Sequence, residues 1–192
     1  MHLEYEFALK REKKMISNLE ISGLSEADLH YELCAANLDG AQRLCTDMIN
    51  GDFSTSYSHA TVVMSLLHHS IELFLKYAIS RSGKKPPTHH YIRGLHEEYN
   101  AAFPDKIFSL ELPFITQFLG YKEDEMDELL KEEQQDRNRT DQMGRYHSDR
   151  SGNHWKGIMA FIPTTFLAQT EFLASRFIAI KEEIERIYEQ PD

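Results

Sequence analysis

Residues 55–82 read TSYSHATVVMSLLHHSIELFLKYAISRS, the most strongly patterned segment of the chain. Its apolar residues recur at steps of three and four, which is the spacing of one face of an α-helix. One stripe consists of Ala60, Val63, Met64, Leu67, Ile71, Phe74, Leu75 and Ala78. A second stripe, on the far side, consists of Val62, Leu66, Leu73 and Tyr77. A helix that is apolar on two sides lies at the centre of a bundle or faces a second subunit, so we expect a homodimer.

The polar residues of this segment gather on one arc of the predicted helix: Thr61, Ser65, His68, His69, Glu72 and Lys76. Glu72 precedes Lys76 by four residues, which is the favourable order for an ion pair on a helix. One alternative is a metal site, which further ligands such as His89 or His90 would have to complete. We predict no metal site and interpret four of these residues as a structural polar arc: His68, His69, Glu72 and Lys76.

Two more long helices are predicted, one on each side of this segment. The first starts at Ser25, which forms a capping box with Asp28, and it continues to about residue 50. Its apolar face consists of Ala27, Tyr31, Cys34, Leu38, Ala41, Cys45 and Met48. The last helix follows Pro163 and runs to about residue 189. Its apolar face consists of Phe166, Thr170, Leu173, Phe177, Ile180, Ile184 and Ile187, and we expect it beside the 55–82 helix at the centre of the bundle.

The segments between these helices are shorter or less regular. A helix capped by Thr88 is predicted to end at Pro104, because proline cannot continue it. Pro113 suits the first turn of a short helix. Residues 122–136 are rich in acids and predict an exposed helix, whereas the glycines of 137–157 predict a long loop.

The chain is expected to form one domain. Residues 25–190 predict a single all-α, up-and-down bundle of five or six helices, and residues 1–24 an N-terminal arm or short helix. A chain of 192 residues buries a core without disulfides, and Cys34 and Cys45 lie too far apart on one helix to form one. Because we find no membrane span and no apolar signal core, we expect a cytoplasmic protein that does not contact a membrane.

Several catalytic motifs are missing from the sequence. No two glycines have G-x-G spacing, no C-x-x-C pair occurs, and no Glu stands three residues before a His. These absences argue against a dinucleotide site, a C-x-x-C site and a di-iron bundle. We therefore expect no cofactor.

A cluster of arginine and histidine residues lies in the loop 137–157, in a chain whose formal net charge is −10. Arginine binds phosphate in a bidentate manner, and histidine transfers protons near neutral pH. We assign five of these residues to anion or RNA binding: Arg137, Arg139, Arg145, Arg150 and His154. If the chain is an enzyme, Arg145 and His147 are the candidate catalytic residues of a metal-independent ribonuclease. The alternative is a structural loop whose arginines pair with the acids of 122–136.

Two motifs resemble the HEPN superfamily. The first is His69-Ser70-Ile71-Glu72-Leu73-Phe74-Leu75-Lys76, followed by Gly83 and Thr88-His89-His90. The second is Arg145-Tyr146-His147-Ser148-Asp149 with Gly152-Asn153, which is similar to the R-Y-P-x-D segment of HEPN-like proteins. The resemblance covers about residues 30–190. It implies an all-α bundle, usually a homodimer, that acts as a metal-independent ribonuclease or, without catalysis, binds nucleotides or partner proteins.

The catalytic members of that superfamily carry Arg-x(4–6)-His, and no Arg–His pair in this chain has that spacing. We therefore expect a non-catalytic HEPN-like module that binds a nucleotide, RNA or a cognate partner protein, in a defence, stress or toxin–antitoxin setting. A ribonuclease with a shifted Arg145 and His147 geometry is one alternative. A plain protein-interaction scaffold is the other.

Overall fold

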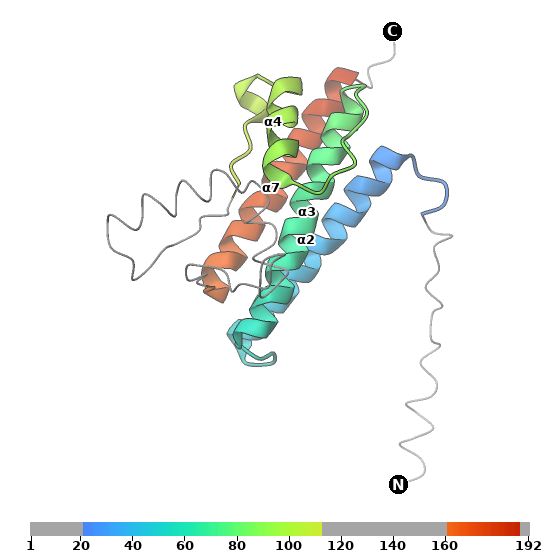
Figure 1. The fold of residues 1–192 in the computed structure, drawn as a ribbon. Coiled ribbons are helices and arrows are strands. Elements are labelled where there is room, and N and C mark those ends of the chain that lie inside the picture. The colour runs from blue at the N-terminus through green and yellow to red at the C-terminus, as the bar shows by residue number, and fades with distance from the viewer. Residues whose placement is uncertain (1–20, 113–160, 189–192) are drawn as a thin grey trace, which may run out of the picture.

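The structure, a computed structural model, describes residues 21–112 and 161–188. Its elements are α2 (Glu26–Asn50), α3 (Tyr57–Arg81), α4 (Ile92–Ala102), the 3-10 helix η2 (Lys106–Phe108) and α7 (Pro163–Tyr188) (Figure 1). No strand occurs in these two ranges, so the predicted all-α class is confirmed for them. The predicted helix at Pro113, the acidic helix 122–136 and the loop 137–157 lie outside the described residues, as do residues 1–20 of the N-terminal arm.

The three long helices lie side by side (Figure 1). α2 and α3 run in opposite directions and form the most extensive of the described helix interfaces, while α7 runs in the same direction as α3. The short helix α4 packs against the C-terminal half of α3. α3 therefore contacts every other described α-helix, which is the central position that its two apolar stripes predict.

The ends of α2 and α3 lie at the residues whose side chains favour them. The Ser25 side chain accepts a hydrogen bond from the Asp28 amide at 3.1 Å, which confirms the predicted N-cap. Gly51 has φ of +83° and its N–H donates to the Asp47 carbonyl, so the left-handed conformation that glycine tolerates closes α2. Gly83, at φ of +81°, has the same role two residues beyond α3.

The seam between α2 and α3 is built from small and sulfur-containing side chains. Ser70 of α3 donates a hydrogen bond to the Cys34 carbonyl of α2 at 3.0 Å, and the Cys34 thiol lies 3.3 Å from the same hydroxyl. Further along, Cys45 is fully buried against Val63. Both cysteines are free thiols, as their predicted separation requires.

The second apolar stripe of α3 is covered largely by the chain itself. Leu73 and Tyr77 are buried, and the Tyr77 ring lies 5.1 Å from the Tyr31 ring of α2. These two residues therefore need no second subunit, and the part of the dimer argument that rests on them is wrong. Val62, by contrast, is 46% exposed, and Leu66 is half-buried.

The helix predicted to start at Thr88 starts at Ile92 instead. Tyr91 is extended and its side chain makes no capping hydrogen bond. The helix does not start at Thr88 because Nδ1 of His90 bonds to Glu72 of α3 at 2.7 Å, which holds the segment before Ile92 against α3. The predicted buried face of this helix is confirmed at Ile92, Leu95 and Tyr99.

By length and composition alone α3 is apolar enough to cross a membrane. In the bundle 78% of its most apolar window is buried, as in the core helix of a soluble protein. The described fold is therefore compatible with a soluble chain.

Candidate functional site

The predicted anion site and catalytic pair lie outside the described residues. This concerns Arg137, Arg139, Arg145, His147, Arg150 and His154. Their roles stay predictions, and the site described below is built from other residues.

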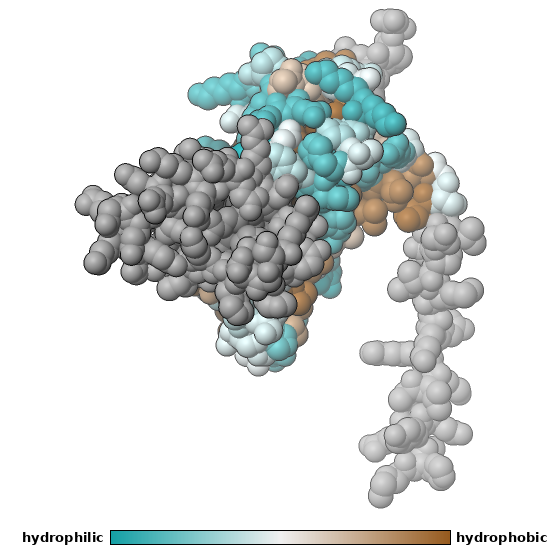
Figure 2. Space-filling model, viewed as in Figure 1, coloured by the Kyte–Doolittle hydropathy of each residue, from teal (hydrophilic) through white to brown (hydrophobic). Residues whose placement is uncertain are grey.

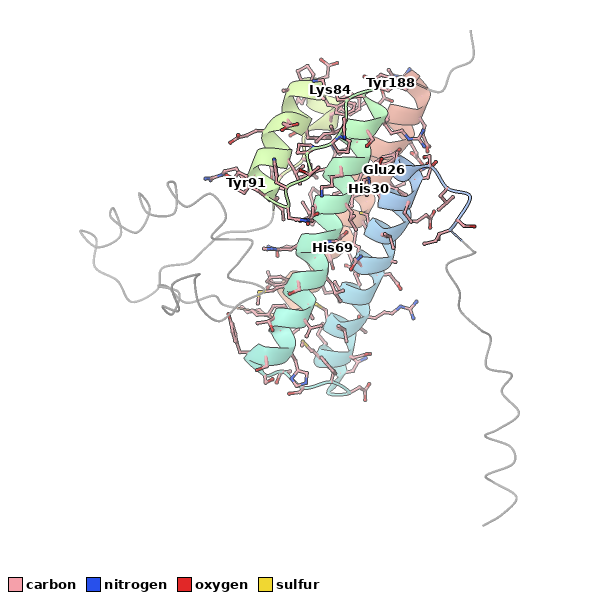
Figure 3. The ribbon with its side chains drawn as sticks, turned by 45° about the vertical axis from the view of Figure 1, so that its right-hand side comes forward. Glu26, His30, His69, Lys84, Tyr91 and Tyr188 are labelled. Carbon is pink, nitrogen blue, oxygen red and sulfur yellow. The ribbon has the colours of Figure 1, made fainter. Side chains whose placement is uncertain are left out.

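The predicted polar arc of α3 divides into a core residue and a cluster around one carboxylate. His68 is buried in the bundle. Glu72 is only 1% exposed, and Lys76 is buried beside it. His69, which Figure 3 labels on α3, is half-exposed. The polar arc therefore includes both core residues and a partly exposed one, His69, within about two helical turns.

Glu72 is the centre of this cluster. Its Oε1 accepts hydrogen bonds from the Lys76 ammonium at 3.0 Å and from Nδ1 of His90 at 2.7 Å. Nδ1 of His69 lies 3.7 Å from the other carboxylate oxygen. A buried carboxylate is tolerated only when it is paired and hydrogen-bonded, and here one oxygen receives both donors. We call Glu72, Lys76, His69 and His90 the Glu72 cluster.

The surroundings keep Glu72 ionised. Burial by itself raises the pKa of the Glu72 carboxyl, but the hydrogen bonds and positive charges of His90 and Lys76 outweigh burial. The net result is a pKa below the ordinary value. At neutral pH the carboxylate can only accept hydrogen bonds, so Nδ1 of His90 must carry the proton between them.

α2 contributes a further imidazole to this region. His30 is half-buried, and its Nδ1 has no hydrogen-bond partner within residues 21–112 and 161–188. Burial lowers the pKa of His30, the charge of Lys76 lowers it further, and the carboxylates of Glu26 and Glu72 act in the opposite direction. Figure 3 shows Glu26 and His30 near the start of α2, above His69 on the neighbouring helix α3. The Glu72 cluster thus lies where α2, α3 and the segment before α4 meet.

That segment is basic. Residues 84–93 read KKPPTHHYIR and contain no acid. Lys84, Lys85, His89, His90 and Arg93 are all exposed. Among the described residues no carboxylate forms an ion pair with Lys84, Lys85 or Arg93. Hydrophilic side chains gather over this end of the molecule (Figure 2). Because these cations lack carboxylate partners within the described residues, the segment is a candidate anion-binding surface in a chain whose formal charge is −10.

Sequence reasoning missed this basic segment. It assigned anion binding to residues 137–157 alone, although the acid-free run of 84–93 was readable in the sequence. It named His90 as an optional metal ligand and as part of the Thr88-His89-His90 motif. Its bond to Glu72, eighteen residues away, depends on how the chain returns after Pro86-Pro87.

A groove lies between α2 and α7. Its volume is about 130 Å³, and it is lined mainly by apolar side chains, among them Tyr31, Leu38, Phe177 and Ile178. The Cys34 thiol also lines it, and burial raises the pKa of that thiol to about 12. Because the thiolate is the nucleophilic form, this burial disfavours Cys34 as a nucleophile.

The chain matches no protein-family model, no curated protein and no solved structure. Within the described ranges, no group of three or more His, Cys, Asp or Glu side chains is placed to hold a metal ion. The chemistry of the candidate site therefore has to be argued from its own residues.

Proposed function

We propose that this chain is a HEPN-like bundle of five or six helices that binds RNA or a nucleotide through phosphate groups, without catalysis. The proposal keeps the function expected from the HEPN resemblance and adds the segment 84–93 as a binding surface. Both ligands share the phosphate group, which is the chemistry that the exposed cations recognise.

One observation carries the proposal: three exposed cations, Lys84, Lys85 and Arg93, stand within ten residues that contain no acid. Some other exposed cations of the described ranges do have a carboxylate partner, as Arg43 has in Asp39 and Arg186 has in Glu183. These three have no such partner among the described residues. Arg93 offers a guanidinium fork for two phosphate oxygens, and the lysines add mobile positive charge.

The test compares two charge reversals that differ only in place. Lys85→Glu removes a cation from the segment, whereas Lys106→Glu changes an exposed lysine of η2. We expect Lys85→Glu to weaken binding of an eight-nucleotide oligouridylate by about tenfold at low salt. It should also lower the slope of log K against log salt by about 1, as for one lost phosphate contact.

Parallel titrations with ATP and with the oligouridylate separate a nucleotide from RNA as the ligand. Equal weakening by Lys85→Glu and Lys106→Glu would show a general charge effect and contradict this surface. If the wild type binds neither ligand, the binding proposal is wrong and the result favours a protein-interaction scaffold.

A further inference from the structure

His89 presents an aromatic ring at the surface of the basic segment. The residue is exposed, and the backbone N–H of Tyr91 donates a hydrogen bond to its Nδ1 at 3.3 Å. The Tyr91 ring lies beside the imidazole, with the two ring centroids 6.1 Å apart. The His89 ring is therefore held in one orientation while it remains accessible to a ligand.

Gly94, in the first turn of α4, makes this arrangement possible. A Cβ atom added to Gly94 would lie 2.7 Å from Cδ1 of Tyr91 and 3.3 Å from Cε1 of His89. Both distances are shorter than an ordinary contact between carbon atoms, so both rings pack directly against the backbone of α4. A glycine inside a helix weakens that helix relative to alanine, and here it stands where two aromatic side chains need the space.

An exposed aromatic ring within a cationic segment is the combination by which proteins hold single-stranded nucleic acids. Lys84 and Lys85 precede His89 along the chain, and Arg93 follows it. Figure 3 shows Lys84 just beyond the end of α3 and Tyr91 before the start of α4. A single nucleotide carries phosphate on one side of its base, whereas a strand carries phosphates on both sides. The order of cation, ring and cation along the segment therefore fits a strand.

We propose that the His89 ring stacks on an unpaired base of a single-stranded RNA, while the cations on either side of it contact the flanking phosphates. Every base has a π-face, so this contact tolerates any sequence. The stack requires no charge on the imidazole, so the carboxylates that follow on α4, Glu97 and Glu98, do not enter into it. The inference rests on the proposed function and narrows its ligand from RNA or a nucleotide to a strand with exposed bases.

The test compares two ligands of the full chain by fluorescence anisotropy. One is the eight-nucleotide oligouridylate, and the other is an abasic ribose–phosphate strand of the same length, which keeps the phosphates and lacks the bases. We expect the wild type to bind the oligouridylate at least about fivefold more tightly, the lower limit for one base–aromatic stack. His89→Ala should abolish this preference. It should leave the affinity for the abasic strand and the slope of log K against log salt unchanged, because no phosphate contact is lost.

Two further variants separate stacking from other roles of the ring. His89→Phe keeps a flat aromatic face without ring nitrogens, so it should bind the oligouridylate within about twofold of the wild type. Tyr57→Ala is the matched control, because Tyr57 is 56% exposed and begins α3. It lies about 36 Å from the other end of that helix, where the basic segment starts, and its loss should leave both affinities unchanged.

Equal wild-type affinity for the two strands would overturn the inference while the proposed function stands, and this comparison needs no variant. A His89→Phe variant that binds as weakly as His89→Ala would also overturn it. If ATP binds more tightly than the oligouridylate and His89→Ala weakens both by the same factor, the ligand is a nucleotide and the assignment to a strand is wrong. The pair Lys85→Glu and Lys106→Glu tests the proposed function separately. A wild type that binds no oligouridylate would overturn both.

Discussion

Glu72 shows how one buried charge is made tolerable. It lies on a helix whose neighbouring residues are almost all in the core, yet its carboxylate meets an ammonium and an imidazole. Removing a carboxylate of this kind leaves Lys76 buried without its partner, and such groups cost more when unpaired than their pairing contributes. The residue is therefore expected to matter for stability as well as for holding His90.

Glu72→Ala should lower the free energy of unfolding by about 1–3 kcal/mol at neutral pH. Because the folded state lowers the pKa of Glu72, this stabilisation is present above the pKa of the unfolded chain and is lost as the pH falls through the lower, folded value. Urea unfolding of wild type and variant should therefore give curves that converge at acid pH.

Glu32→Ala, an exposed acid on α2, is the control and should change stability by less than about 0.5 kcal/mol. A Glu72→Ala variant of unchanged stability that has lost ligand binding would show that the carboxylate serves the ligand alone.

At the scale of elements, η2 is fastened to the bundle through its backbone. The Arg176 guanidinium of α7 donates to the carbonyl oxygens of Ile107 at 2.9 Å and Ser109 at 2.8 Å. The Tyr99 hydroxyl of α4 donates to the Phe108 carbonyl between them. Three consecutive carbonyls thus receive donors from two helices, and the Phe108 side chain is buried beneath.

Arg176→Ala should lower the free energy of unfolding by about 1–2 kcal/mol, because two charge-assisted hydrogen bonds are lost at a partly exposed site. Amide hydrogen exchange should rise in residues 106–110 before it rises in α3. Arg43→Ala, which removes an exposed ion pair with Asp39, should change neither measurement appreciably. Unaltered exchange in η2 would mean that Tyr99 and the Phe108 side chain suffice to hold it.

The sequence predicted the ends of a helix correctly where residues within one turn of that end determine it. Ser25 and Gly51 act within one turn, so the ends of α2 are legible from neighbouring residues. Thr88 failed as a cap because a bond between His90 and Glu72, which spans a proline-containing turn, holds that segment out of the helix. The Glu72–Lys76 pair was predictable from helical spacing, whereas the third partner depends on tertiary structure.

At the scale of the whole molecule, periodicity identified α3 as apolar on two sides but carried no information on what covers each side. Tyr77 is covered by Tyr31 of the same chain. Val62 is 46% exposed on the same stripe, and only this end of the stripe still favours a second copy. A hydrophobic pattern indicates which side chains are buried. It does not indicate whether a neighbouring helix of the same chain or a second subunit buries them.

We expect a homodimer of about 45 kDa by light scattering at tens of micromolar, twice the chain mass of 22.4 kDa. Val62→Asp should shift the chain toward the monomer, because a charge in an apolar interface is not compensated. Ile107→Asp, at another exposed apolar residue, should leave the mass unchanged. A wild-type mass of 22.4 kDa would contradict the dimer.

The two buried thiols of the α2–α3 seam make the opening of the bundle measurable by thiol labelling. Burial raises the pKa of Cys34 to about 12 and that of Cys45 to about 11, and both side chains are enclosed. A thiol reagent reacts with the exposed thiolate, so in the native chain it must wait until the bundle opens around α2. The two sulfurs sit three helical turns apart on one helix, so their separate labelling rates time the opening of the seam at two points along its length.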